Sequence, residues 1–258
     1  MGFIFMVNLS DISLFLADIF SECGHTDVSN NGLQVQGSSE VSKILFAVDA
    51  CQASFDSAVS EGADLLIVHH GISWGGGLKR LSSYHAKRLK TLFNADISLM
   101  AFHLPLDAHP EIGNNAVLAD MLKLQGRQEF FEYGGGPIAF YGSLETPCDA
   151  EEIAAILDAE LPTECLILEA DNWESLQKIA VVSGGGADAL EECAELGLDC
   201  LVTGEVLHQH VHLARELGIT VIEAGHYASE TCGIKKLQEK IAKKFPVECK
   251  FVDIPTGL

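Results

Sequence analysis

The sequence predicts an α/β protein made of two related halves, in which parallel strand pairs are covered by helices. Three observations predict this fold class. Short apolar segments alternate with segments whose apolar residues recur at helical spacing, which is typical of parallel sheets packed between helices. The same order of elements recurs later in the chain. With 258 residues, 48% of them hydrophobic and 21% charged, the chain is long enough for two modest domains, each with a core.

The first half alternates predicted helices with predicted strands. Helical spacing predicts helices over residues 9–20, 51–61 and 84–93. Apolar or alternating segments predict strands over residues 33–36, 43–48, 65–68 and 97–102, and the Asn30-Asn31-Gly32 turn precedes the first of them. From residue 43 the order is strand, helix, strand, helix, strand, which implies parallel pairs joined by helical crossovers.

The second half repeats this order. Strands are predicted over residues 179–182, 200–202 and 220–224, and helices over 187–196 and 208–216. The offset that aligns Lys43 with Lys178 also aligns Asp64 with Asp199. The identities are few, so coincidence stays open, but the matched order of elements favours two related halves. The glycine-rich segment Arg127–Pro147 is a plausible linker region, which gives predicted domains of residues 1–126 and 127–258.

The charge balance bears on the class of partner. The chain carries 37 acidic and 16 basic residues, a formal net charge of −21. Such a surface repels phosphate backbones, so general nucleic-acid binding is not expected. The basic clusters Lys79-Arg80, Lys87-Arg88 and Lys235–Lys244 are interleaved with other residues, as on a solvated face.

Cysteine usage and the apolar segments indicate a cytoplasmic protein. None of the eight cysteines forms a C-x-x-C pair, and a disulfide framework is improbable for a core of this size. The apolar N-terminus lacks the basic region of a signal peptide, and no apolar segment is long enough to cross a bilayer. We therefore expect no membrane association.

Three predicted strands end in histidine. The segment 63–68 runs directly into His69-His70, and a buried strand has no packing reason to finish in two imidazoles. The segment 98–102 is followed by His103 and Asp107, and the segment 220–225 by His226 and Glu230. Ligands of open α/β sheets bind beyond the carboxyl ends of strands, and imidazole is a common metal ligand. The pattern predicts a metal site.

The spacing leaves the arrangement of these ligands open. His226 and Glu230 share a face if a helix begins there, whereas Pro105 favours a loop between His103 and Asp107. Adjacent His69 and His70 point to opposite faces of a regular strand. Either the strand has ended before them, which Gly71 permits, or each serves a different metal.

The donor types select a class of cation. Imidazole with carboxylate and without thiolate suits Zn, Mn, Fe, Co or Ni. The number of candidate ligands exceeds the need of one four-coordinate site and suits two divalent metal ions, whose bound water could serve as a nucleophile.

Three further features have competing interpretations. His208, His210 and His212 look like a metal tract, but their period of two scatters them around a helix, so a solvated or interface helix is favoured. Glu205 follows the strand that corresponds to the His69 strand; it is a metal-supporting residue, a general base or a helix N-terminal carboxylate. Gly184-Gly185-Gly186 resembles a phosphate cradle but lacks the order of known phosphate motifs.

Several long motifs occur in one order along nearly the whole chain. They are Asn31–Val35, Val68–Gly71 with Trp74, His103–Glu111, Gly113–Asn115, Ser183–Gly186, Thr203–Glu205 and Ala224–Glu230. In these motifs the chain resembles the Nif-three-like family (NGG-one interacting factor three), also catalogued as GTP cyclohydrolase one, type two homologs.

The resemblance implies two three-layer α/β/α domains with mixed sheets, a dinuclear metal site between them, and a homohexamer. The family's metal ligands match His69, His70, Asp107, His226 and Glu230. His103 and Glu205 match positions near the metals and are the candidate catalytic residues.

The resemblance also supplies two functional hypotheses. The first is a metal-dependent hydrolase of a small heterocyclic or nucleotide-like substrate, in which GTP ring opening is suggested only by the catalogue name. The second is a non-catalytic metal-binding or regulatory interaction protein, suggested by the family's other name.

Overall fold

The computed structural model describes residues 5–76, 80–171 and 173–258. The chain divides into two compact units. The first unit contains the chain up to Leu106 together with Ile234–Ile254, and the second contains Asp107–Gly233 with Pro255–Leu258. Lys79, which belongs to a basic cluster considered above, and residues 1–4 of the apolar N-terminus lie outside the described residues.

The first unit is built on a five-stranded mixed sheet of order β13-β4-β5-β6-β2. Its strands are β2 (Gly32–Val35), β4 (Lys43–Asp49), β5 (Leu65–His70), β6 (Ser98–Ala101) and β13 (Glu248–Phe251). All neighbours are parallel except β2, which pairs antiparallel with β6 at one edge. A separate short pair joins β1 (Val7–Asn8) and β3 (Glu40–Val41).

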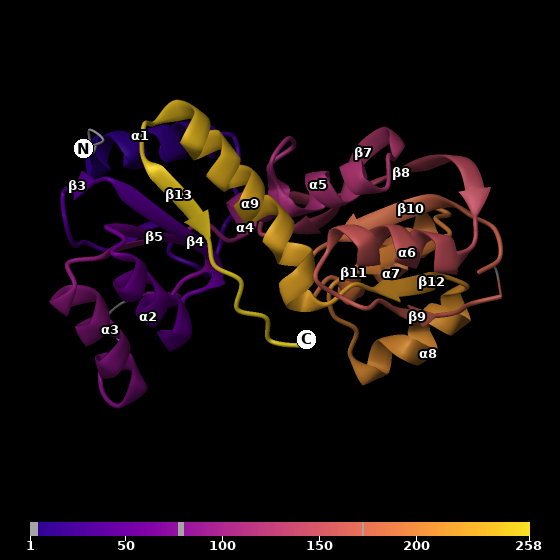
Figure 1. The fold of residues 1–258 in the computed structure, drawn as a ribbon. Helices are drawn as coiled ribbons and strands as arrows, with labels where there is room; N and C mark the ends of the chain where they lie inside the picture. The colour runs from indigo at the N-terminus through magenta and orange to yellow at the C-terminus, as the bar shows by residue number, and fades with distance from the viewer. Residues whose placement is uncertain (1–4, 77–79, 172) are drawn as a thin grey trace. The chain divides into compact units, whose positions relative to one another are not determined.

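Helices cover both faces of this sheet (Figure 1). They are α1 (Leu9–Ile19), α2 (Gln52–Glu61), α3 (Tyr84–Asn94) and the part of α9 (His226–Lys244) that belongs to the first unit. Alternate residues of β4 and β5, such as Leu45 and Leu66, pack with Phe55 of α2 and Leu92 of α3. The strands are apolar on both faces because helices lie on both, as expected of a sheet buried between layers.

The second unit contains a six-stranded mixed sheet of order β7-β8-β10-β11-β12-β9. Its strands are β7 (Gln125–Tyr133), β8 (Gly136–Cys148), β9 (Leu166–Leu168), β10 (Leu176–Val182), β11 (Cys200–Thr203) and β12 (Thr220–Glu223). The central strands β10, β11 and β12 are parallel, and β8 and β9 flank them antiparallel. The helical elements are α5 (Asn114–Met121), α6 (Ala150–Glu160), η1 (Ala187–Ala189), α7 (Leu190–Glu195), α8 (His208–Leu217) and the start of α9.

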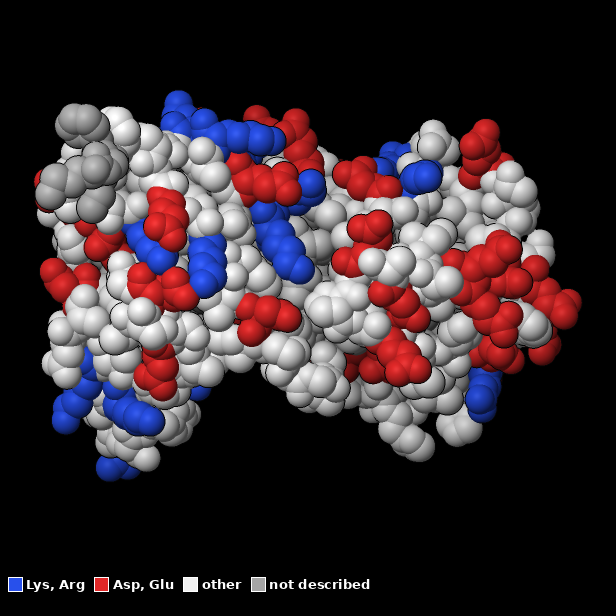
Figure 2. All heavy atoms as spheres, in the orientation of Figure 1, with Lys and Arg blue, Asp and Glu red and all other residues white. Residues whose placement is uncertain are grey.

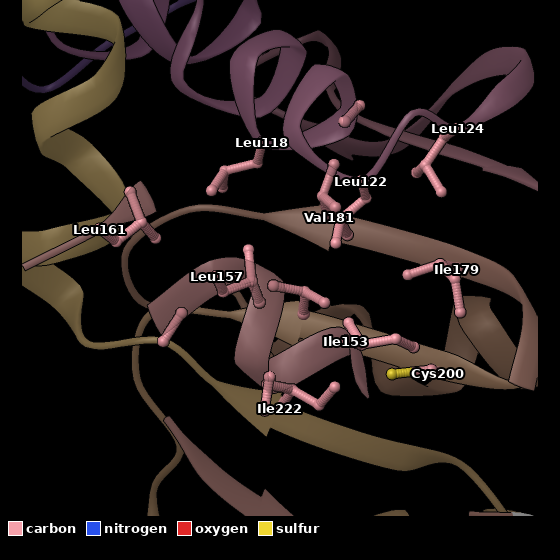
Figure 3. Close-up of a cluster of buried hydrophobic side chains, with 14 of the residues drawn as sticks. Leu118, Leu122, Leu124, Ile153, Leu157, Leu161, Ile179, Val181, Cys200 and Ile222 are labelled. Atoms are coloured by element: carbon pink, nitrogen blue, oxygen red, sulfur yellow. The ribbon is translucent and has the colours of Figure 1, made fainter. Parts of the chain in front are cut away.

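Two hydrophobic clusters cover the two faces of this sheet. On one face Ile179 and Val181 of β10 pack with Leu118 of α5 and with Ile153 and Leu157 of α6 (Figure 3). On the other face the intervening residues of β10, Ala180 and Val182, belong to a cluster that also contains Leu190, Cys193 and Ala214 of α7 and α8. The second unit is therefore also a three-layer α/β/α structure.

The two sheets share a common plan. In each, three parallel strands joined by helices carry an antiparallel strand on one edge: β4-β5-β6 with β2, and β10-β11-β12 with β9. The expected fold class of two related α/β domains with mixed sheets is therefore confirmed.

The unit boundaries differ from the predicted domains 1–126 and 127–258. Strand β13 pairs with β4, which returns Ile234–Ile254 to the first unit. Helix α5 packs in the second unit's core, which moves the other boundary to Leu106. Neither boundary could be predicted from hydrophobic periodicity, because periodicity identifies a helix or strand without showing which sheet it joins or packs against.

Two local predictions were wrong. Arg127–Pro147 is not a linker: it forms most of the β7–β8 hairpin, with Gly134 and Gly135 at positive φ in the turn. Residues 104–108 are not a loop but the short helix α4 (Leu104–Ala108). Pro105 is compatible with this helix because it lies in the first turn, where its missing N–H is not needed.

Acidic side chains dominate part of the surface. Figure 2 shows acidic and basic side chains interspersed over the first unit, whereas acidic side chains gather over the visible face of the second. Within the described part of the chain, no helix combines the length and apolar character needed to cross a membrane.

Candidate metal centre

The end of strand β5 carries His69 and His70, which both still belong to the strand. Of the two alternatives left open by the sequence, the one in which the strand ends before the histidines is wrong; the other, that each histidine serves a different metal, stays a prediction. Their ring centroids are 4.6 Å apart, and a ring nitrogen of each lies within 4.8 Å of a ring nitrogen of His103. His103 follows the neighbouring parallel strand β6, so the carboxyl ends of β5 and β6 bring three imidazoles together.

In each of these three imidazoles, the Nδ1 atom forms a hydrogen bond with an oxygen atom. His69 Nδ1 lies 2.9 Å from the Phe102 carbonyl oxygen, and His70 Nδ1 lies 3.0 Å from Asp49 Oδ1. His103 Nδ1 lies 2.9 Å from Asp27 Oδ1. A carbonyl or carboxylate oxygen can only accept, so Nδ1 must carry the hydrogen, and in the neutral ring Nε2 carries the lone pair. Metal-binding histidines are oriented in this way.

The segment after His70 is held by the amide of Gln34. Gln34 Oε1 accepts hydrogen bonds from the backbone N–H groups of Ile72 and Ser73, at 2.8 and 3.0 Å. A Cβ added to Gly71 would overlap the Gln34 amide and Ala101 Cβ, so a side chain here would displace Gln34 from these hydrogen bonds. The Asn31–Val35 motif therefore fixes the backbone beside the histidines.

The second unit holds Asp107 through a network of polar side chains. Asn114 Nδ2 and Ser183 Oγ donate to Asp107 Oδ1, at 2.8 and 3.1 Å. Asn115 Oδ1 in turn accepts from the Ser183 backbone N–H at 2.6 Å. Asp107 is buried, and a carboxylate oxygen of Asp107 lies within 4.8 Å of one of Glu230.

His226 and Glu230 share a face of α9, as their spacing predicts. His226 Nε2 lies 3.2 Å from Glu230 Oε1, and His226 Nδ1 lies 2.8 Å from Glu205 Oε2. The hydrogen bond with Glu230 is the largest cause that raises the pKa of His226 to about 9, against the opposing effect of burial; Glu205 also raises it. The carboxylates thus concentrate negative charge around this imidazole, a setting that also favours a bound cation.

Glycines allow backbone to lie against these ligands. Gly184 has φ +61°, and a Cβ at this position would lie 2.4 Å from Glu230 Oε1 and 3.3 Å from His226 Nε2. Gly204 N–H and Glu205 N–H both donate to the Gly184 carbonyl at 2.9 Å. Within Gly184-Gly185-Gly186, the residue that lies against the candidate ligands is therefore Gly184, which gives this glycine a role without a phosphate.

The His208-x-His210-x-His212 tract contains a structural histidine. His210 is buried, its Nδ1 accepts from the Leu207 backbone N–H at 3.2 Å, and its Nε2 donates to Asp188 at 3.1 Å. Both ring nitrogens are thus engaged in hydrogen bonds that support the start of α8. His208 and His212 are exposed, in accord with the interpretation of a solvated helix for most of the tract.

The structure places the predicted site residues in two sets. We call His69, His70 and His103 the first-unit set and Asp107, His226 and Glu230, with Glu205 beside them, the second-unit set. Sequence reasoning missed Asp27, Asp49 and the polar network around Asp107. Asp49 had a signal, because it ends a strand beside the His70 strand; Asp27 lies in a segment without helix or strand and had none.

The donors fit borderline divalent cations. They are imidazole nitrogens and carboxylate oxygens, and no described cysteine belongs to a group that could hold a metal. This composition agrees with the prediction from sequence of Zn, Mn, Fe, Co or Ni.

Comparison with known proteins identifies the family. The family model Duf34/NIF3 (NGG1p interacting factor 3) matches residues 7–256. Two relatives, from Pyrococcus abyssi and Pyrococcus horikoshii, are 43% and 45% identical over 96% of this chain and 98% of theirs, and each is named GTP cyclohydrolase 1 type 2 homolog. The crystal structure of TTHA1606 from Thermus thermophilus is similar with a TM-score of 0.88 at 36% identity, over 98% of this chain and 100% of that one. The chain therefore belongs to the Duf34/NIF3 family.

Proposed function

We propose that the protein binds two divalent metal ions and is a metal-dependent hydrolase. His69, His70, Asp107, His226 and Glu230 would hold the metals. The observation that carries the proposal is the orientation of two histidines: His69 and His70 each direct Nδ1 to an oxygen acceptor, which puts the lone pair of the neutral ring on Nε2, the atom that would bind a metal.

The roles of the remaining residues follow from their contacts. Divalent cations supply Lewis acidity and activate water for hydrolysis. His103, with its Nδ1 bound to Asp27, can exchange a proton at Nε2. Glu205 contacts His226 Nδ1, so it can fix that ligand's orientation, and its partly exposed carboxylate can also accept a proton.

The substrate class rests on the donors and on the relatives' name. A small heterocyclic or nucleotide-like compound suits a metal site that activates water, and GTP is the first compound to test because the relatives are named GTP cyclohydrolase 1 type 2 homolog. The net charge of −21 opposes an anionic substrate, so the metals would have to supply the attraction for phosphate groups.

The test is turnover of GTP and related heterocycles by metal-loaded protein, followed by chromatography of the products. The His69→Ala protein should lose this turnover, and His208→Ala serves as a matched control because His208 is an exposed histidine of α8 outside both sets of candidate site residues. If the wild-type protein leaves all compounds unchanged, or if wild type and His69→Ala behave identically, the hydrolase proposal is contradicted.

A second candidate is a non-catalytic metal-binding or regulatory interaction protein. The family description, NGG1p interacting factor 3, favours it. Glu230→Gln discriminates the two: it should abolish turnover in a hydrolase, whereas in an interaction protein it should change only metal content or partner binding.

A further inference from the structure

Asp27 is a buried carboxylate in a segment without regular structure. Its side chain is 2% exposed. Oδ1 accepts hydrogen bonds from the Ser29 N–H at 2.9 Å and from His103 Nδ1 at 2.9 Å. Oδ2 accepts from Asn31 Nδ2 at 2.9 Å and from the Leu104 N–H at 3.0 Å, and lies 3.2 Å from His103 Nδ1, the longer of the ring's two contacts. Four donors thus converge on one carboxylate, which cannot rotate without losing several of them.

The same contacts fix the His103 ring and its backbone. The His103 N–H donates to Asn31 Oδ1 at 2.8 Å, so Asn31 links the histidine backbone to Asp27. The Trp74 ring lies edge-on to the His103 ring at 5.2 Å, and Trp74 Nε1 donates to the Gly71 carbonyl oxygen at 2.8 Å. The ring is therefore held on one edge by Asp27 and on another side by an anchored indole.

We propose that Asp27 is a positioning residue that holds His103 in the Nδ1–H tautomer and thereby presents Nε2 as a proton acceptor. The inference rests on the proposed hydrolase function for its catalytic consequence. It assigns a role to Asp27 that differs from that of Asp49 and Glu205, which contact metal-ligand candidates and are 34% and 43% exposed.

The Asp27→Asn substitution should reverse this tautomer for a specific reason. If the new amide nitrogen took the place of Oδ2, it would face two donors, Asn31 Nδ2 and the Leu104 N–H, and would also lie 3.2 Å from His103 Nδ1. If it takes the place of Oδ1, it faces the Ser29 N–H and the ring, and the ring can respond by moving its proton to Nε2. The second orientation leaves fewer donors unsatisfied, so the introduced amide should donate to Nδ1.

The experiment measures the histidine tautomer, the zinc content and the turnover of three single variants and of the double variant Asp27→Asn/His103→Asn. Long-range proton–nitrogen spectra of zinc-loaded protein with ¹⁵N-labelled histidine report which ring nitrogen is protonated, and His103→Asn identifies the signals of His103. His103→Asn keeps an amide donor near the place of Nδ1 but removes Nε2, so it should fold even if Asp27→Asn weakens the segment. Asp49→Asn is the matched control, the same substitution beside His70.

The proposal predicts the Nδ1–H tautomer in the wild type and the Nε2–H tautomer in Asp27→Asn. Zinc content should stay unchanged in Asp27→Asn and His103→Asn and fall in Asp49→Asn. With GTP as the probe, Asp27→Asn and His103→Asn should each lower kcat by about 10²-fold with little change in KM. The double variant should be no slower than the single ones, because both act through one atom.

Two results would overturn the proposal. An unchanged tautomer in Asp27→Asn removes the positioning role, and loss of zinc in Asp27→Asn and His103→Asn makes His103 a metal ligand with Asp27 as its support. If the wild-type protein turns over none of the compounds, the hydrolase proposal fails, while the tautomer still decides whether Asp27 sets the state of His103.

Discussion

Asp49 and His70 are register partners on the neighbouring parallel strands β4 and β5, and Asp49 Oδ1 lies 3.0 Å from His70 Nδ1. The pairing fixes the imidazole from the sheet itself, so the orientation of His70 does not depend on a loop. We expect Asp49→Asn to weaken metal binding by about 10- to 100-fold, the usual effect of removing a residue that orients a ligand. Isothermal titration with zinc measures this change.

The control for this prediction is Asp56→Asn. Asp56 lies on α2, is exposed and accepts a hydrogen bond from Gln52 at 2.8 Å. Its substitution should leave the zinc affinity unchanged. Equal affinities of Asp49→Asn and the wild type would contradict the role assigned to Asp49.

Gly184→Ala should disturb the second-unit set directly. The added methyl group would lie 2.4 Å from Glu230 Oε1, and the backbone φ of +61° is unfavourable for alanine. We expect a loss of about 1–3 kcal/mol in the free energy of unfolding, together with weaker metal binding. Chemical denaturation and zinc titration measure the two effects.

The neighbouring glycine supplies a matched comparison. A Cβ at Gly185 would meet nothing within 4 Å, so Gly185→Ala should change both quantities little. If the two alanine variants had the same stability and affinity, the close contact between Gly184 and Glu230 would not matter.

The ion pairs of Glu61 should stabilise the first unit at neutral pH and lose this effect in acid. It lies 2.6 Å from Lys250 Nζ of β13 and 2.9 Å from Lys43 Nζ of β4. The hydrogen bonds from Lys250 and then Lys43 lower the pKa of Glu61 to about 2 from an ordinary 4.5. Because the pKa is lower in the folded state, the stabilisation is complete above pH 4.5 and disappears as the pH falls toward 2.

Thermal unfolding of Glu61→Gln and wild type between pH 7 and pH 2 tests whether the stabilisation by Glu61 is lost on acidification. The variant should melt a few degrees below the wild type at pH 7, and the difference should vanish near pH 2. Glu239→Gln, which removes an exposed pair with Lys236, should show no such pH dependence. A difference between Glu61→Gln and the wild type that grows on acidification would contradict the ion-pair account.

The parts of the fold that repeat a strong local pattern could be predicted from the sequence. The predicted strand over 43–48 and helix over 51–61 correspond to β4 (Lys43–Asp49) and α2 (Gln52–Glu61). Strand β13 could not be placed, because its pairing with β4 joins segments far apart in the chain. The hairpin over Gln125–Cys148 was missed because its glycine-rich turn obscured the strands on either side.

The same contrast holds for the site. His69 and His226 could be predicted because a strand end is an unusual place for imidazole and because four residues separate His226 from Glu230. Asp27 could not be predicted, because its role depends on four hydrogen-bond donors that only the tertiary fold brings together. They belong to Ser29, Asn31, His103 and Leu104. The tautomer of a histidine is likewise a property of its neighbours and not of the sequence.

Metal content per chain tests the central claim most directly. Elemental mass spectrometry should compare wild type with the His70→Ala/Glu230→Ala variant after loading with zinc and removal of excess metal. The control is His208→Ala/His212→Ala, which removes two exposed histidines of α8 and so reports any metal bound on that surface. The account predicts two equivalents of zinc per chain in the wild type and in the control, and their loss in His70→Ala/Glu230→Ala. Equal metal content in all three proteins would contradict the account.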